Sequence, residues 1–448
     1  MDALEHHHVL VDILRHLPPR RLAACRCVRT AWRATIDDHR LLRAAELPLS
    51  PHGIFYETIA MDIPKLFCRP STASHVAATF RALDGPLSKP VLMDCCNGLL
   101  LLYYHVLNPA TSQMIQLPPL PGSCTYSDCT RCDDNQYILY DPTLSSHYEV
   151  FLIPTIPCVL PSEHISRHIC HGGGPVYAME WPPSPFIMHV FSSKTMLWEK
   201  RSFVRQGKAA GTVIHIKSPT FEESLYHAAY WREALYVRCA DGFVLRINKG
   251  NDTYRVIKLP YGKHGTPRLG KSKNGVYCAL LYRPCSFEIW FLDESSEKMK
   301  WVLKNRISLE PVKKYSRTNY ADEQWILESC DPLEHVSKNG AKLDRVEDKD
   351  EALLVEDDVE WNSDDEDTID TAEWPTKCSH NAHIFSCLGF HPYKKIVFFN
   401  GGGSTVAYHF NSSKIRHLGT MEDGRYSDMV ESFPYAPCCV RNLPGSNN

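Results

Sequence analysis

The sequence predicts an α+β multi-domain protein, in which a small all-α module precedes a mainly-β, propeller-like domain with a disordered acidic insert. Three observations predict this class. Apolar residues near the N-terminus recur at helical spacing, short apolar strands alternate with polar turns from Gly53 onward, and one late segment is dense in acidic side chains. The predicted units are residues 1–48, 53–343, 344–374 and 375–445, of which the second and fourth together form the β domain.

One apolar stripe predicts a first helix near the N-terminus. Its members fall at positions i, i+3, i+4 and i+7, which share one helical face: Leu10, Ile13, Leu14 and Leu17. The pair Pro18-Pro19 ends this helix, because proline lacks the backbone N–H and clashes with the preceding turn.

A second helix is expected from about Arg20 to Thr35, ended by Asp37-Asp38. Its apolar stripe consists of Ala24, Cys25, Val28, Ala31, Trp32 and Ile36. A helical piece of this size has little core of its own, so the two stripes either pack on the rest of the chain or dock another protein.

The arginines of this N-terminal part suggest DNA binding by a helix-turn-helix as an alternative. Residues 1–48 hold eight arginines against six acidic residues, which is a small excess of positive charge. The segment also lacks a cluster of Asn, Gln, Ser or Thr that would contact base edges. A solvated basic face explains the arginines better, and we expect no nucleic-acid partner.

Residues 9–42 resemble an F-box, and in particular the F-box of the large plant family that carries an associated C-terminal β domain. The match includes Leu17-Pro18, Leu22 and the segment from Cys27 to Arg33. The resemblance implies a substrate-recruiting subunit that binds a Skp1-type adaptor and, through it, a cullin ubiquitin ligase. The implied adaptor-binding residues are Leu10, Ile13, Leu14, Leu17, Pro18, Leu22, Val28 and Trp32. The usual Leu-Pro and acidic opening is replaced by Glu5 to His8, which puts this binding in doubt.

From Gly53 onward the chain repeats a unit of an apolar strand, a polar turn and a second strand. Six copies can be matched, with a further one expected between Gly53 and Asn97, as in a β-propeller. Each copy centres on a short polar residue whose side chain can accept hydrogen bonds from the backbone just ahead. These centres are Asn108, Asp141, Ser192, Asn248, Asp293 and Asn411. A pair of β-sandwiches remains the alternative architecture.

Two segments of the β region resemble the domain that follows the F-box in the same plant family. The stretch "VLMDCCNGLLLLYY", which begins at Val91, is similar to the first motif of that domain, "D-x-x-N-G-L-L-L". Residues 431–445, "ESFPYAPCCVRNLPG", are similar to its C-terminal segment. The resemblance assigns these motifs mainly to the fold.

Residues 344–374 contain fifteen acidic side chains and two basic ones. Such a run repels itself and predicts a disordered or partly helical insertion. An acidic ligand for a basic partner is the alternative.

The chain shows no recognisable catalytic set, cofactor motif or metal site. The segment from His171 to Gly174 lacks the G-x-S-x-G partner of a lipase, and Gly401 to Gly403 belongs to no phosphate-binding motif. Cys124, Cys129 and Cys132 do not have the paired spacing of a zinc site.

Composition excludes two further classes of function. Hydrophobic residues make up 44% of the 448, charged residues 23%, and the net charge is −3. The longest apolar run is far shorter than the roughly 20 residues of a membrane span, and the N-terminus lacks the apolar core of a secretory signal. We therefore expect no membrane contact, a cytoplasmic or nuclear location, and mostly reduced thiols among the 18 cysteines.

The sequence supports three hypotheses for function. The first is the ligase subunit, in which loops of the β domain bind an unknown target protein. The second is a protein-binding β scaffold that is uncoupled from the ligase because the F-box opening is degenerate. The third, a propeller enzyme, has no catalytic set to support it.

Overall fold

The computed structural model describes residues 10–11, 13–14, 25, 28–38, 51–58, 64–69, 91–121, 134–154, 178–216, 227–239, 242–260, 266–283, 285–296, 298–312, 325–329, 368–374, 384–401, 404–421, 429–438 and 443–444. Within these residues the protein is nearly all β. Residues 10–11, 13–14, 25 and 28 are helical, and the further helices in this part of the chain are α3 (Thr30–Asp38) and the single turn α5 (Val213–Ile216). The expected α+β class, with an all-α module of its own, is therefore wrong.

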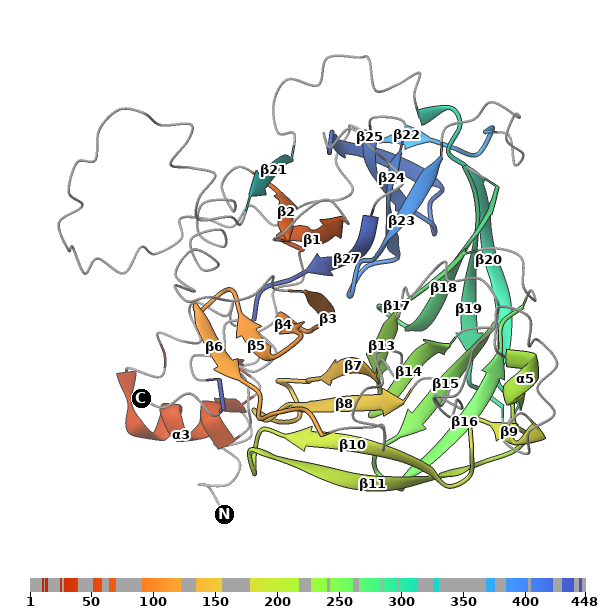
Figure 1. The fold of residues 1–448 in the computed structure, drawn as a ribbon. Coiled ribbons are helices and arrows are strands. Elements are labelled where there is room, and N and C mark those ends of the chain that lie inside the picture. Colours follow the sequence, from red (N-terminus) through yellow and green to blue (C-terminus); the bar gives the residue numbers. More distant parts are fainter. Residues whose placement is uncertain are drawn as a thin grey trace, which may run out of the picture.

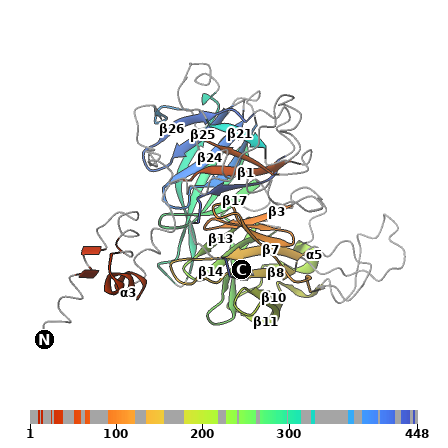
Figure 2. The same cartoon turned by 90° about the vertical axis from the view of Figure 1, so that its left-hand side faces the viewer.

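Among the N-terminal residues that the structure describes, no independent all-α module is formed, because these residues bury too little. Within this part, Leu14 and Ile36 form a buried cluster with Leu10 and Cys25 packed at its margin, which is far less than an independent domain needs. The second helix also differs from expectation. Arg29 interrupts it, and α3 continues through Asp37-Asp38. Figures 1 and 2 show α3 lying at one side of the β structure.

Six four-stranded antiparallel units, which we call blades 1 to 6, follow one another around the molecule (Figure 1). Each is given from its innermost to its outermost strand. Blade 1 comprises β27 (Met429–Tyr435), β1 (Gly53–Thr58), β2 (Lys65–Cys68) and β21 (Ile326–Ser329). Blade 2 comprises β3 (Leu92–Cys96), β4 (Leu99–Leu102), β5 (His105–Asn108) and β6 (Gln113–Gln116). Blade 3 comprises β7 (Asp134–Leu139), β8 (Glu149–Pro154), β10 (Phe186–Ser192) and β11 (Leu197–Arg205).

The remaining three blades lie in the second half of the chain. Blade 4 comprises β13 (Ala228–Trp231), β14 (Ala234–Cys239), β15 (Phe243–Asn248) and β16 (Thr253–Lys258). Blade 5 comprises β17 (Thr266–Ser272), β18 (Gly275–Arg283), β19 (Ser286–Asp293) and β20 (Lys300–Ser308). Blade 6 comprises β23 (Phe385–Phe390), β24 (Ile396–Gly401), β25 (Ser404–His409) and β26 (Lys414–Gly419). Two short strands, β9 (Glu180–Trp181) and β12 (Gly211–Thr212), pair with each other.

The blades close into a propeller-like ring. Innermost strands of neighbouring blades contact each other from β13 through β17, β23, β27 and β3 to β7. Blades 3 and 4 are joined at their outer edges, where β11 and β16 pair in parallel and make one continuous eight-stranded sheet. The C-terminal strand β27 pairs with β1 from the N-terminal half, with Phe55 opposite Phe433. Pairing of these distant segments closes the ring without a covalent link.

Hydrophobic cores lie between successive blades rather than on one side of each sheet. Leu235, Tyr236 and Val237 are consecutive residues of β14, and all three are buried. Side chains that alternate between the two faces of this strand are therefore buried on both, because neighbouring blades cover both faces.

The polar turn centres are largely confirmed. Asn108, Ser192, Asn248 and Asp293 each end the third strand of a different blade. Their side-chain oxygens accept a hydrogen bond from the backbone N–H two residues on, at 2.9–3.3 Å. Asp141 makes the same bond, to Thr143, but lies in the loop between β7 and β8. In blade 6 the matching position is His409, the last residue of β25, and not Asn411.

The copies do not correspond one to one with the blades. Two of them, 137–154 and 188–204, lie in the single blade 3. The further copy expected between Gly53 and Asn97 is wrong, since β1 and β2 belong to blade 1 and β3 begins blade 2. Blade 1 combines both ends of the β region, which no local sequence pattern indicates.

Most of the predicted acidic insert, residues 344–367, lies outside the described residues. The residues that follow contain β22 (Ile369–Asp370), which pairs with β26 so that Asp370 lies opposite Lys414. Within the described part of the chain, no helix has the length and apolar character to cross a membrane.

Candidate functional site

A cavity of about 80 Å³ lies at the centre of the ring. All six blades contribute to its wall, through residues that include Asn97, Ile138, Tyr230, Lys271, Tyr393 and Ala436. Several of these lie where an innermost strand ends and turns toward the second strand of its blade. We call the side of the ring that carries these turns the turn face. The cavity therefore sits on the ring axis toward the turn face.

Arg268 of β17 connects four blades beside this cavity. Its guanidinium donates hydrogen bonds to the backbone oxygens of Ser432 in blade 1 and Leu388 in blade 6. It also lies 3.3 Å from the Glu431 carboxylate and bonds to the imidazole of His227, which directly precedes blade 4. All of these side chains are buried. A planar guanidinium with five donors can satisfy such a set of acceptors, whereas a lysine could not.

His227 is neutral in this arrangement. Burial, followed by the charges of Arg268 and Arg238, holds the pKa of its imidazole well below the usual value. Since a guanidinium can only donate, Nε2 must be the acceptor, and the ring proton lies on Nδ1. Nδ1 is 3.3 Å from the Glu431 carboxylate, although without hydrogen-bond geometry. The cluster thus holds one buried cation and one buried anion, joined by a neutral ring.

Asp94 of β3 is a buried carboxyl of the cavity wall. Its two oxygens accept hydrogen bonds from the backbone N–H groups of Cys95, at 2.8 Å, and Ile138, at 3.0 Å. Burial raises its pKa to about 7, against the lowering effect of these two bonds. The bond to Ile138 ties blade 2 to blade 3.

The two segments singled out by their family resemblance meet at this site. Asp94 and Asn97 come from "DCCNG", and Glu431 and Ser432 come from the C-terminal segment. Asn97 adopts a positive φ of 48° and donates to the backbone oxygen of Tyr140 at 2.6 Å. Gly98 has a φ of +85°, and a Cβ there would lie 2.5 Å from the backbone nitrogen of Cys438. These residues position neighbouring blades.

Sequence reasoning missed the basic side of the site. Arg268 and Lys271 lie in "TPRLGKS", which reads as an ordinary strand. The available signal was a charged residue, Arg268, between the apolar residues Pro267 and Leu269 of a strand. His227 and Tyr393 are single residues among 22 histidines and 21 tyrosines, and nothing local distinguishes them.

Lys271 lies across the cavity on the turn face. It extends from blade 5 and donates a hydrogen bond to the side-chain oxygen of Asn97 in blade 2. Tyr393 of blade 6 lines the same cavity, and its buried hydroxyl has no hydrogen-bond partner in the part of the chain that the structure describes. Both residues therefore line the cavity, and each has a donor that makes no hydrogen bond among the described residues.

The cysteines of the cavity wall are poor nucleophiles. Burial raises the pKa of Cys96 to about 11 and that of Cys95 well above its usual value, so both thiols are protonated at neutral pH. Among the described residues, eight cysteines are free and Cys285 is disulfide-bonded. Within the same residues, no three His, Cys, Asp or Glu side chains are grouped to hold a metal ion.

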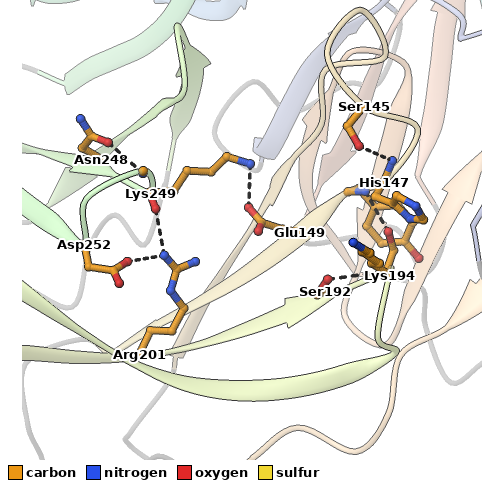
Figure 3. A network of polar contacts seen from close by, with 12 residues as sticks. Ser145, His147, Glu149, Ser192, Lys194, Arg201, Asn248, Lys249 and Asp252 are labelled. Carbon is orange, nitrogen blue, oxygen red and sulfur yellow. Dashed lines mark hydrogen bonds and ion pairs between the residues drawn. The ribbon is translucent and has the colours of Figure 1, made fainter.

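A second polar network lies on the outer part of blades 3 and 4 (Figure 3). Lys249, in the turn after β15, pairs with Glu149 of β8 at 2.9 Å. Arg201 of β11 pairs with Asp252 and donates to the backbone oxygen of Lys249 at 2.9 Å. These contacts pin the β15–β16 turn of blade 4 to blade 3 and support the parallel pairing of their outer strands. Their role is structural.

The sequence-predicted adaptor-binding residues lie far from the cavity in the chain and separate into three groups. Ile13 and Val28 are exposed, at 58% and 61%, and Leu14 is buried. Leu10 and Trp32 are half-buried. Leu17, Pro18 and Leu22 lie outside the described residues, as do Cys124 to Cys132 and His171 to Gly174.

No family model matches the chain, and no curated protein matches it. Among solved structures, one described as "YCF48 bound to D1 peptide" is similar with a TM-score of 0.32 and 8% identity, over 83% of this chain and 82% of that one. Apo AztD from Citrobacter koseri is similar with a TM-score of 0.28 and 10% identity, over 82% and 77%. Both TM-scores are below 0.5, so neither likeness carries an argument about this protein.

Proposed function

We propose that this chain is a protein-binding scaffold, in which the rigid ring presents its turn face, with the central cavity in the middle, to a partner protein. The observation that carries the proposal is the size and chemistry of the cavity. At about 80 Å³ it is well below the ~300–1,000 Å³ of ordinary small-molecule pockets. It matches the tip of one side chain, which is how a partner's anchor residue is buried at the centre of an interface.

The remaining groups of the site favour a rigid binding surface over a catalytic site. The guanidinium of Arg268 is engaged by four acceptor groups from three neighbouring blades. Asp94 accepts two backbone hydrogen bonds, and the nearby thiols are protonated. A pre-organised surface of this kind favours binding because few groups need to be ordered on association.

Site-specific photo-crosslinking tests the proposal. A photo-reactive amino acid at Asn274, in the exposed turn between β17 and β18, reports on the turn face. The matched position is Tyr104, which is exposed in the β4–β5 turn on the opposite face. We expect a discrete crosslinked partner from Asn274, absent from Tyr104. Equal crosslinking from both faces, or none from either, would overturn the proposal.

The ligase role is a second candidate, for which we infer docking of a Skp1-type adaptor on the N-terminal residues. The supporting observation is that Ile13 and Val28 stay exposed while Leu14 and Ile36 of the same segment are buried. Two exposed aliphatic side chains on short helical segments are suited to apolar contact with a partner.

A binding assay with a purified Skp1-type adaptor tests this second candidate. The double variant Ile13→Asp/Val28→Asp should lose binding, since each buried aliphatic side chain is worth ~1.5–3 kcal/mol. Thr30→Asp, at an exposed position of α3, is the control and should bind as the unmodified protein does. Failure of the unmodified chain to bind would leave the scaffold as the remaining proposal.

A further inference from the structure

We propose that the central cavity binds a carboxylate, supplied by an aspartate or glutamate side chain of the partner and held by the ammonium of Lys271 and the hydroxyl of Tyr393. The identity of the partner rests on the proposed scaffold function. The chemistry of the cavity does not depend on that function, because it follows from the groups in the cavity wall.

Lys271 is a cation paired with a neutral group. Its ammonium donates to the amide oxygen of Asn97, and this is its single hydrogen bond among the described residues. The side chain is half-buried and lines the cavity. An ammonium removed from water needs an anionic acceptor to recover its lost hydration. Two of its three N–H donors are free to meet one.

The other charged groups of the cavity wall are already matched. Arg268 pairs with Glu431 and uses its remaining donors on His227 and two backbone oxygens. The Asp94 carboxyl accepts two backbone N–H groups, and burial raises its pKa to about 7, so that it is partly protonated at neutral pH. Among the described residues that line the cavity, Lys271 therefore carries the positive charge that has no anionic partner. A cationic ligand would meet this charge directly and is disfavoured.

Tyr393 supplies a second donor. Tyr393 lines the cavity from blade 6, and its hydroxyl is buried and lacks a partner within the described residues. A buried hydroxyl without a partner is unfavourable, and an incoming acceptor removes this cost. A carboxylate can accept from Lys271 through one oxygen and from Tyr393 through the other, whereas a single hydroxyl or thiol could not bridge both donors in this way.

Entry of the carboxylate requires Lys271 to leave Asn97. The bond that breaks joins a cation to a neutral amide, and the bond that forms joins it to an anion. Charge-assisted hydrogen bonds are roughly twice as strong as neutral ones. Asn97 stays in place after the exchange, because its amide nitrogen still donates to the backbone oxygen of Tyr140 at 2.6 Å. The wall is thus unchanged when the ligand enters.

Sodium acetate is the probe for this site, because it reproduces the tip of the acidic side chain and fits the cavity. Binding is followed on the full chain by saturation-transfer NMR of the acetate methyl group. We expect saturation transfer to acetate but not to acetamide or to methylammonium. Sodium phosphate is included as a competitor. If phosphate displaces acetate at equal concentration, the preferred anion is a phosphate and the carboxylate proposal is overturned.

Lys271→Met should weaken acetate binding by at least about tenfold, and Tyr393→Phe by about threefold. Lys273→Met is the matched control, since Lys273 is exposed two residues further on in the same segment. It should bind acetate normally. The Met and Phe side chains keep most of the original volume, and unchanged thermal unfolding confirms that each variant folds.

Equal acetate binding by Lys271→Met and the unmodified chain would overturn the carboxylate site, as would equal binding of acetamide. These outcomes are independent of the crosslinking experiment. Acetate binding without a crosslinked partner would leave the site intact and contradict the scaffold. A partner crosslinked from the turn face, without acetate binding, would support the scaffold and contradict the carboxylate site.

Discussion

Arg268 shows how one residue determines the interior of this ring. It lies at the junction of four blades and neutralises Glu431 inside the protein. A buried ion pair of this kind contributes little net stability, but removal of one partner leaves an uncompensated charge. The geometry therefore indicates that Arg268 determines how the four blades meet.

Arg268→Met is expected to destabilise the protein by about 3–5 kcal/mol, because Glu431 would remain buried without its counter-charge. The measurement is the guanidinium unfolding midpoint. Lys208→Met, at an exposed position, is the control and should change the free energy of unfolding by less than about 0.5 kcal/mol. A midpoint for Arg268→Met equal to that of the control would show that the ion pair does not hold the blades.

Asp94 makes stability depend on pH in a direction opposite to that of a salt-bridged carboxylate. Its pKa is raised to about 7 in the folded protein, so the folded state retains a proton that the unfolded state releases near pH 4. The folded state therefore loses stability as pH rises from about 4 to about 7, and above that the loss is constant.

Asp94→Asn should remove this dependence. The stability of the unmodified protein relative to Asp94→Asn is expected to fall between pH 5 and pH 8, by up to about 3 kcal/mol. The variant also loses a backbone hydrogen bond at every pH, because its amide N–H₂ group must face one of the N–H donors of Cys95 and Ile138. Unfolding free energies of both proteins at the two pH values provide the test. A difference that does not vary with pH would contradict the raised pKa.

At the scale of elements, the turns were the most predictable features. The polar centres Asn108, Ser192, Asn248 and Asp293 accept backbone hydrogen bonds from two residues ahead, as their sequence context indicates. This is because a turn is determined by neighbouring residues. The turn between β17 and β18 is likewise short and consists of Lys273 and Asn274, since Ser272 pairs with Gly275.

Gly98, in the turn between β3 and β4, combines a left-handed backbone with close packing. Gly98→Ala is expected to cost about 2–4 kcal/mol, from backbone strain and from displacement of Cys438. Gly207→Ala is the matched control, because Gly207 also has a positive φ but has open space around its Cα. It should cost about 1 kcal/mol, the strain alone. Equal losses in thermal unfolding would show that the contact with Cys438 is unimportant.

For the whole molecule, closure depends on a pairing between distant segments. β27 pairs with β1 and places Phe433 and Tyr435 in a core with Phe55. The aromatic rings of Phe55 and Tyr435 pack edge to face, with centroids 5.1 Å apart. Without β27 the ring would expose the edge of β1 and the innermost face of two neighbouring blades.

Deletion of residues 429–448 is therefore expected to abolish cooperative unfolding and to cause aggregation. Deletion of residues 445–448 alone is the control and should leave the unfolding midpoint unchanged. Circular dichroism during heating and size-exclusion chromatography measure the two effects. A soluble truncated chain with the original midpoint would show that the other blades are stable without closure.

The sequence by itself determined the recurring strand-turn-strand units and the turn residues that end their third strands, because these depend on residues close together in the chain. Only the tertiary structure decided which strands share a blade, as blade 1 shows by combining β27 with β1, β2 and β21. It also decided the site. Asn97, Lys271 and Tyr393 are separated by more than a hundred residues from one to the next, and ring closure brings their side chains to one cavity.

The N-terminal apolar stripe also shows what local spacing cannot determine. Helical spacing indicates an apolar face, but a module also needs a core of sufficient size, and Leu14 with Ile36 does not provide one.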